Sequence, residues 1–136
     1  TPTPLSDVDV AYFDADLSQK RDAQLQHQLH TLAPGIAWEV TNQAAVHLWF
    51  ERVFGHPVPP LRSLEEAVAS WPEFATCIGL SLTKNDSIHV IAPHGLADLF
   101  SMIIRRNPAR VSIETFQQRV QQKRYKERWP RVTVIQ

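Results

Sequence analysis

The sequence contains little cysteine, few glycines and no long apolar run. Cys77 is the single cysteine among 136 residues, which excludes an intramolecular disulfide and is typical of a reducing compartment. No stretch approaches the ~18 consecutive apolar residues of a membrane span, and no charged segment followed by an apolar one resembles a signal peptide. We therefore expect a cytoplasmic protein with no membrane partner.

Histidine and cysteine are too scattered to predict a zinc site. The six histidines form no His-x-x-x-His pair, and no cluster of cysteine and histidine exists. The apolar neighbours of Cys77 indicate a buried or half-buried strand position, where a thiol packs inertly rather than acting as a nucleophile. His47 is interpreted as a hydrogen-bonded structural residue.

The net charge of zero conceals a strong asymmetry along the chain. Residues 1–104 hold five Lys/Arg and twelve Asp/Glu, a net charge of −7, whereas residues 105–136 hold nine and two, a net charge of +7. An acidic body with a basic tail suits a site that holds metal on one side and an anion such as a triphosphate on the other. The alternative is a solvated helix whose charges aid solubility, with the cations of its last turns complementing the helix dipole.

Two carboxylates lie two residues apart in a run that alternates like a β-strand. Asp7 and Asp9 alternate with Val8 and Val10 within residues 5–13, so they share one face of the predicted strand, ~6.7 Å apart along its rise. Such a face suits divalent cations, whose charge offsets the repulsion between carboxylates. The alternative interpretation is an edge strand whose solvent face is acidic.

A third carboxylate is predicted on a neighbouring strand. Helical spacing of Leu25, Leu29 and Leu32 predicts a helix that begins after Ser18 and ends before residue 34, followed by a strand over residues 36–40. This order indicates a βαβ unit or an antiparallel relative of one. Glu39 lies between apolar residues of the second strand, so adjacent strands would bring it beside the two aspartates.

The rest of the chain is expected to form one domain over residues 1–136, with residues 76–136 as its C-terminal part. We expect a helix capped by Asn42 and ending at Gly55, a short helix from Ser63 to Trp71, and a hairpin of residues 77–82 and 87–91. Further predicted elements are an amphipathic helix with Leu96, Leu99, Phe100 and Ile103 on one face, a basic helix from Ser112 to Arg128, and a closing strand over 131–135.

Four segments together resemble the polymerase-β-type nucleotidyltransferase superfamily, and within it a bacterial nucleotidyltransferase-like family. They are SDVDVAYFD, WEVTNQAAVHLWF, IAPHGLADLFSMIIRRNP and KRYKERWP. The resemblance implies an α+β fold, with a mixed β-sheet and flanking helices. It also implies that Asp7, Asp9 and Glu39 hold two Mg²⁺ or Mn²⁺ ions, which align a nucleoside triphosphate for attack by a hydroxyl. The third acid assists deprotonation of that hydroxyl in some superfamily members.

Candidate nucleotide-binding residues accompany the three acids. Ser6 belongs to the acidic motif, and Asn42 begins a helix whose free N–H groups would receive phosphate oxygens. Arg62 and Lys123 are cations that would offset the triphosphate, although a solvent-exposed role is the usual one for such residues.

The superfamily carries a Gly-Gly or Gly-Ser turn before its acidic strand, whereas the first glycine here is Gly35. We expect the turn to lie in a segment upstream of Thr1. Two functions therefore remain open, a magnesium-dependent nucleotidyltransferase with an unknown hydroxyl acceptor and an inactive relative that binds a nucleotide, nucleic acid or protein. Nucleic-acid binding by the basic helix is a third interpretation and is not favoured, because the net charge is zero and no pattern of stacked aromatics is present.

Overall fold

The computed structural model describes residues 3–136. The chain divides into two compact units, residues 1–64 and 65–136, and each is described by itself. Parallel and antiparallel strands are distributed over three two-stranded sheets. The prediction of a single domain over residues 1–136 stays a prediction.

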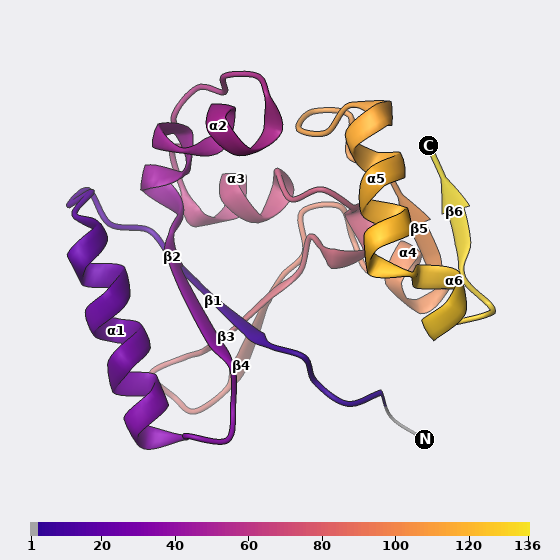
Figure 1. The fold of residues 1–136 in the computed structure, drawn as a ribbon. Coiled ribbons are helices and arrows are strands. Elements are labelled where there is room, and N and C mark those ends of the chain that lie inside the picture. Colours follow the sequence, from indigo (N-terminus) through magenta and orange to yellow (C-terminus); the bar gives the residue numbers. More distant parts are fainter. Residues whose placement is uncertain (1–2) are drawn as a thin grey trace. The chain divides into compact units, whose positions relative to one another are not determined.

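The first unit is a βαβ motif followed by two short helices (Figure 1). Strand β1 (Val8–Tyr12) is joined to β2 (Trp38–Asn42) by helix α1 (Gln19–Leu32), and the chain continues into the 3₁₀ helix η1 (Gln43–Leu48) and helix α2 (Phe50–Phe54). The two strands pair in parallel, as a helical crossover permits. Of the two arrangements that the sequence left open, the βαβ unit is therefore the one observed.

Helix α1 is attached to the sheet by polar contacts as well as apolar ones. Leu25 and Leu29 are half-buried, whereas Leu32, expected on the same face, is 81% exposed. The side-chain oxygen of Gln26 accepts a hydrogen bond from the backbone N–H of Val40 at 3.1 Å. This bond fixes the helix along the edge of β2 that does not pair with β1, so β2 is held on both sides.

The prediction of one continuous helix from Asn42 to Gly55 is wrong. Asn42 caps η1 as expected, but Trp49 leaves helical geometry before α2 begins. Residues 43–46 are all buried, which a single α-helix with one apolar stripe does not allow. The tighter winding buries this run. Within α2, Phe50 stacks on Phe54 one turn later, with ring centroids 4.5 Å apart.

The second unit contains the remaining elements (Figure 1). In order they are α3 (Leu64–Ala69), which begins at the boundary, η2 (Phe74–Thr76), β3 (Gly79–Leu82), β4 (Ile88–Ile91), α4 (Ala97–Phe100), β5 (Ile103–Arg105), α5 (Ile113–Lys123), α6 (Tyr125–Arg128) and β6 (Thr133–Ile135). The predicted hairpin and the predicted closing strand are confirmed. β3 pairs antiparallel with β4, and β6 pairs in parallel with β5.

The predicted amphipathic helix through Leu96 and Ile103 is wrong in its second half. Helix α4 has four residues, and Met102 then adopts a left-handed conformation with φ of 58°. Ile104 is in strand β5, 8% exposed, whereas Phe100 is 78% exposed. Residues 103–105 are extended because they pair with β6 and because the β-branched side chain of Ile104 is buried there. The helical periodicity does not decide the structure here, since its residues do not all face the core.

The predicted basic helix is interrupted at Arg124. Ser112 caps α5, its side chain accepting a hydrogen bond from the backbone N–H of Thr115 at 3.1 Å. Arg124 is left-handed, with φ of 53°, and separates α5 from α6. The turn directs Tyr125 into the core, where the residue is 8% exposed.

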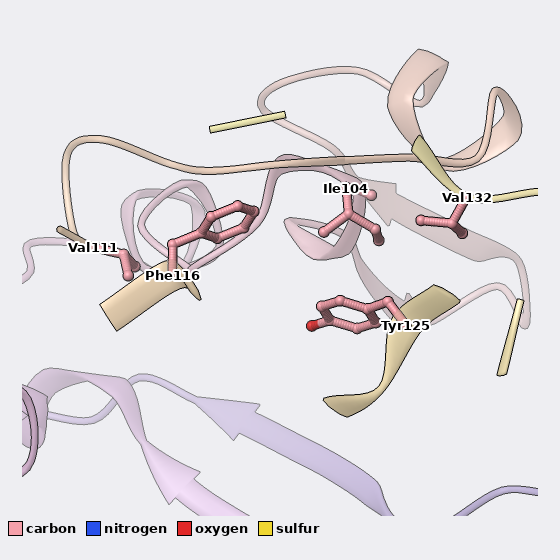
Figure 2. Close-up of a cluster of buried hydrophobic side chains, with 6 residues drawn as sticks. Ile104, Val111, Phe116, Tyr125 and Val132 are labelled. Carbon is pink, nitrogen blue, oxygen red and sulfur yellow. The ribbon is translucent and has the colours of Figure 1, made fainter. Parts of the chain in front are cut away.

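One apolar cluster forms the core of the second unit. Figure 2 shows Phe116 beside Val111, and Tyr125 facing Ile104 of β5 and Val132 just before β6. Phe116 has no exposed surface, so α5 is held against the β5–β6 pair by complete burial of a large side chain.

A buried carboxylate lies next to this cluster. Glu73 is 1% exposed and receives two hydrogen bonds from Arg119, at 2.8 and 3.2 Å, and one from the Tyr125 hydroxyl at 3.3 Å. Burial alone would lower the pKa of Arg119, but the hydrogen bond and charge of Glu73 raise it. Burial and the charge of Glu73 raise the pKa of Tyr125 to about 12. This network ties α5 and α6 to the segment before η2.

Cys77 has the buried, inert environment that the sequence predicts, but it lies between η2 and β3 and not in a strand, so that part of the prediction is wrong. It is fully buried, and its thiol donates to the carbonyl oxygens of Glu73 and Trp71 at 3.2 and 3.4 Å. Burial raises its pKa to about 11, so the reactive thiolate is scarce at neutral pH. Within residues 3–136, no helix combines the length and apolar character needed to cross a membrane.

Replacing Glu73 by glutamine should destabilise the second unit. Glu73→Gln keeps the shape of the side chain but leaves Arg119 charged and largely buried, with a side chain 24% exposed. We expect the free energy of unfolding in urea to fall by about 3 kcal/mol, the lower end of the cost of breaking a buried pair.

The exposed pair Arg124–Glu127 supplies the control for this variant. Both side chains are more than 60% exposed, so Glu127→Gln should cost less than about 0.5 kcal/mol. An equal loss in both variants would contradict a special role of the buried network.

Candidate functional site

Three carboxylates converge on one face of the β1–β2 pair. In the parallel register Asp9 lies opposite Glu39, so their side chains leave the sheet on the same side. Asp7 precedes β1 by one residue and shares this face, because it lies two residues before Asp9. The register therefore brings Glu39 beside two acids that are 30 and 32 residues before it in the sequence.

The distances among these acids suit a metal ion. One carboxylate oxygen from each of Asp7, Asp9 and Glu39 lies within 4.8 Å of the other two, and all three residues are exposed. Ligands on opposite sides of Mg²⁺ are ~4.2 Å apart, twice the ~2.1 Å metal–oxygen distance. The three oxygens can therefore approach one ion with small side-chain adjustments, and such a charge would offset their mutual repulsion.

The opposite face of β1 is the packed one. Val8, Val10 and Tyr12 are half-buried, whereas Asp9 is exposed. The Tyr12 hydroxyl donates a hydrogen bond to Asp22 of α1. Burial, together with this bond and the charge of Asp22, raises the pKa of Tyr12 to about 12. The valines and Tyr12 therefore face α1, and the aspartates that alternate with the valines are accessible on the other face.

Asn42 holds the loop that follows the acidic strand. It is 2% exposed. Its side-chain oxygen accepts from the N–H groups of Asp14 and Ala44 at 3.0 and 3.1 Å, and its amide nitrogen donates to the carbonyls of Asp14 and Asp16 at 2.9 and 3.0 Å. The residue joins the ends of β1 and β2. Its predicted part in nucleotide binding stays a prediction.

The other nucleotide-binding candidates differ in how the structure places them. Ser6 lies beside the acids, and its hydroxyl donates to the Asp7 carboxylate at 3.1 Å. Arg62 is exposed in the connection before α3, and Lys123 is exposed at the end of α5. Lys123 belongs to the second unit. The structure thus groups Ser6 with the three acids, and the binding roles of all these residues stay predictions.

Sequence reasoning missed the residues that support the site from α1. Gln26 and Asp22 bond to the β2 backbone and to Tyr12, yet both occupy helix positions where polar residues are ordinary. Their partners are distant in sequence, so composition and periodicity contain no signal for these contacts.

Comparison with known proteins identifies the family. A family model described as nucleotidyltransferase matches residues 1–134. A structure solved by NMR, described as revealing a CCA-adding enzyme head domain, is 27% identical to the chain. It aligns with a TM-score of 0.78 over 95% of this chain and 67% of that one. No curated protein matches. The chain therefore belongs to the nucleotidyltransferase family, and the predicted fold class is confirmed.

Asn42→Ala should loosen the connection between the two strands. The change removes four hydrogen bonds to backbone groups in a buried place. We expect a loss of about 2 kcal/mol or more in the free energy of unfolding, because the backbone groups lose buried partners. Amide hydrogen exchange should be faster at Asp14 and Ala44.

Asn42→Asp distinguishes the oxygen from the amide nitrogen. The carboxylate retains both acceptor contacts but loses the donation to the carbonyls of Asp14 and Asp16. The oxygen that replaces the amide nitrogen would face these two carbonyl oxygens in a buried place, so the aspartate variant should be no more stable than the alanine variant. An alanine variant as stable as the wild type would contradict the role given to this side chain.

Proposed function

We propose that the protein is a divalent-metal-dependent nucleotidyltransferase, which transfers a nucleoside monophosphate from a nucleoside triphosphate to a hydroxyl acceptor. The observation that carries this proposal is the convergence of Asp7, Asp9 and Glu39 on an exposed sheet face. Family membership and the likeness to a CCA-adding enzyme head domain support nucleotide transfer as the class of reaction. A fold alone does not identify the acceptor.

Magnesium or manganese is the metal that this donor set would hold. Three carboxylates are hard oxygen ligands, which such cations prefer to thiolate or imidazole. Within residues 3–136, the groups of His, Cys, Asp and Glu close enough to hold an ion consist of these acids alone. Metal ions held by these acids would neutralise charge on the triphosphate and on the oxygens that attack and leave.

The reaction requires few further side chains. Asp7 and Asp9 would hold the metal ions, whose positive charge would draw the triphosphate to this face of the sheet. Glu39 completes the site and takes the proton of the acceptor hydroxyl, whose oxygen then bonds to the α-phosphorus. The bond from that phosphorus to the bridging oxygen breaks, and pyrophosphate leaves with the electron pair. Positioning and neutralisation of charge supply most of the catalysis of phosphoryl transfer.

The nucleotide is held by a second group of residues in this proposal. Ser6 lies at the acids and is close to where a phosphate would sit. Asn42 contributes by fixing the loop, because its amide group is already bonded to backbone. Arg62, which belongs to the same unit as the acids, supplies positive charge to the triphosphate.

Removal of two carboxylates should abolish metal binding. Manganese binding to the wild type and to Asp7→Asn/Asp9→Asn is measured by calorimetry, followed by nucleoside triphosphate binding with and without metal. Loss of outer residues at metal sites costs about 10–100-fold in affinity, so we expect the loss of two ligands to exceed about 100-fold. Metal-dependent nucleotide binding should disappear with it.

Asp14→Asn/Asp16→Asn is the matched control, with the same change of charge in the same unit. Both residues are exposed and use a carboxylate oxygen to accept a backbone N–H, a bond that asparagine can also make. Equal metal binding in the wild type and both variants would overturn the metal site. Binding of metal and nucleotide without release of pyrophosphate, across a library of hydroxyl acceptors, would instead indicate an inactive relative.

A further inference from the structure

Positive charge is concentrated in one short stretch of the second unit. The basic segment, defined here as residues 123–131, contains five Lys/Arg and one Glu, a net charge of +4. All five cations are exposed. The segment includes the end of α5, the left-handed turn at Arg124, and α6.

Most of these cations have no carboxylate partner within residues 3–136. Arg124 pairs with Glu127. The remaining four form no ion pair with any residue between 3 and 136; they are Lys123, Lys126, Arg128 and Arg131. In the same unit Arg105 and Arg119 do have carboxylate partners. Helix dipoles account for cations in the last turns of α5 and α6, but Arg131 lies beyond both helices.

An aromatic contact orients one of these arginines. The Arg128 guanidinium carbon lies 4.4 Å from the centre of the Trp129 ring, and that ring stacks on Tyr125 with centroids 6.4 Å apart. Stacking holds the planar guanidinium on one face and leaves its N–H edges in solvent. Such a group is arranged in advance to donate two hydrogen bonds to a phosphate.

We propose that the basic segment binds the phosphate backbone of a single-stranded nucleic acid. Several exposed cations spread over nine residues suit a row of phosphates better than one triphosphate. A lipid surface fits less well, because Tyr125 is buried and Trp129 half-buried, which leaves the segment no fully exposed apolar side chain to enter a membrane. That the bound strand is the hydroxyl acceptor rests on the proposed nucleotidyltransferase activity.

This proposal differs from the expectation from the sequence, which does not favour nucleic-acid binding. The zero net charge sums charges that are segregated along the chain. The aromatic contribution was hidden because Trp129 serves a neighbouring arginine, a contact that composition does not reveal.

The test measures binding of a fluorescently labelled single-stranded RNA by anisotropy, over a range of salt concentrations and in the presence of EDTA. Lys126→Gln/Arg128→Gln/Arg131→Gln removes three cations and leaves Lys123 in place. Each phosphate contact contributes about 0.7 to the salt slope for single strands, so we expect the slope to decrease by about 2 and the affinity to fall at least about tenfold.

Lys20→Gln/Arg21→Gln/Lys84→Gln is the matched control, since it removes three exposed cations elsewhere. Its affinity should remain within about threefold of the wild type. Equal weakening in both variants, or no weakening in the basic-segment variant, would overturn the proposal. Equally tight binding to phosphatidylserine vesicles, lost in the same variant, would overturn it in favour of a membrane.

A further variant separates this proposal from the proposed activity. Asp7→Asn/Asp9→Asn should bind the RNA at least as tightly as the wild type in EDTA, because the binding charges are elsewhere in the sequence. RNA binding that persists without any metal-dependent nucleotide binding in the wild type would support the basic segment and overturn the activity alone. Metal-dependent nucleotide binding without RNA binding would overturn the basic segment alone.

Discussion

The candidate site depends on the parallel register between β1 and β2. Because Asp9 lies opposite Glu39, two carboxylates separated by a helix of 14 residues emerge side by side, and Asp7 joins them through the period of the strand. A shift of one residue in β2 would turn Glu39 to the packed face and place Trp38 or Val40 among the acids. The site therefore requires the correct pairing of the two strands, because only this pairing brings the three acids together.

The contacts that stabilise this register lie on the face of the strand pair opposite the acids and at its end. The half-buried valines and Tyr12 pack behind β1, and Gln26 of α1 occupies a backbone donor of β2. Asn42 closes the far end by bonding to backbone on both sides of the strand pair. Like charges gathered on one face repel each other, so the stabilising contacts have to come from elsewhere. These contacts come from helix α1 and from the buried amide group of Asn42, so the acidic face stays accessible.

Much of this unit could be predicted from the sequence, because its signals are local. Alternation of Val8 and Val10 with the two aspartates fixes a strand and its faces, and Ser18, Asn42 and Gly55 mark boundaries that the structure contains. Predictions failed where contacts with residues distant in the sequence determine the local backbone conformation. Residues 103–105 continue a helical periodicity in sequence but pair with β6 instead, and Arg124 breaks a basic helix so that Tyr125 reaches Glu73. No local pattern encodes those partners.

The positive charge of residues 105–136 includes cations that pair with carboxylates and cations that do not, a difference that the net charge of the segment does not show. Arg119 forms an ion pair with the buried carboxylate of Glu73, and Arg105 forms one with Asp98. Such cations stabilise the unit and attract no ligand, because their fields are cancelled locally. The exposed cations of residues 123–131 have no such cancellation, except at Arg124. Net charge cannot distinguish these two cases, whereas the ion pairs can. The cations without a carboxylate partner are the ones whose field a polyanion would encounter.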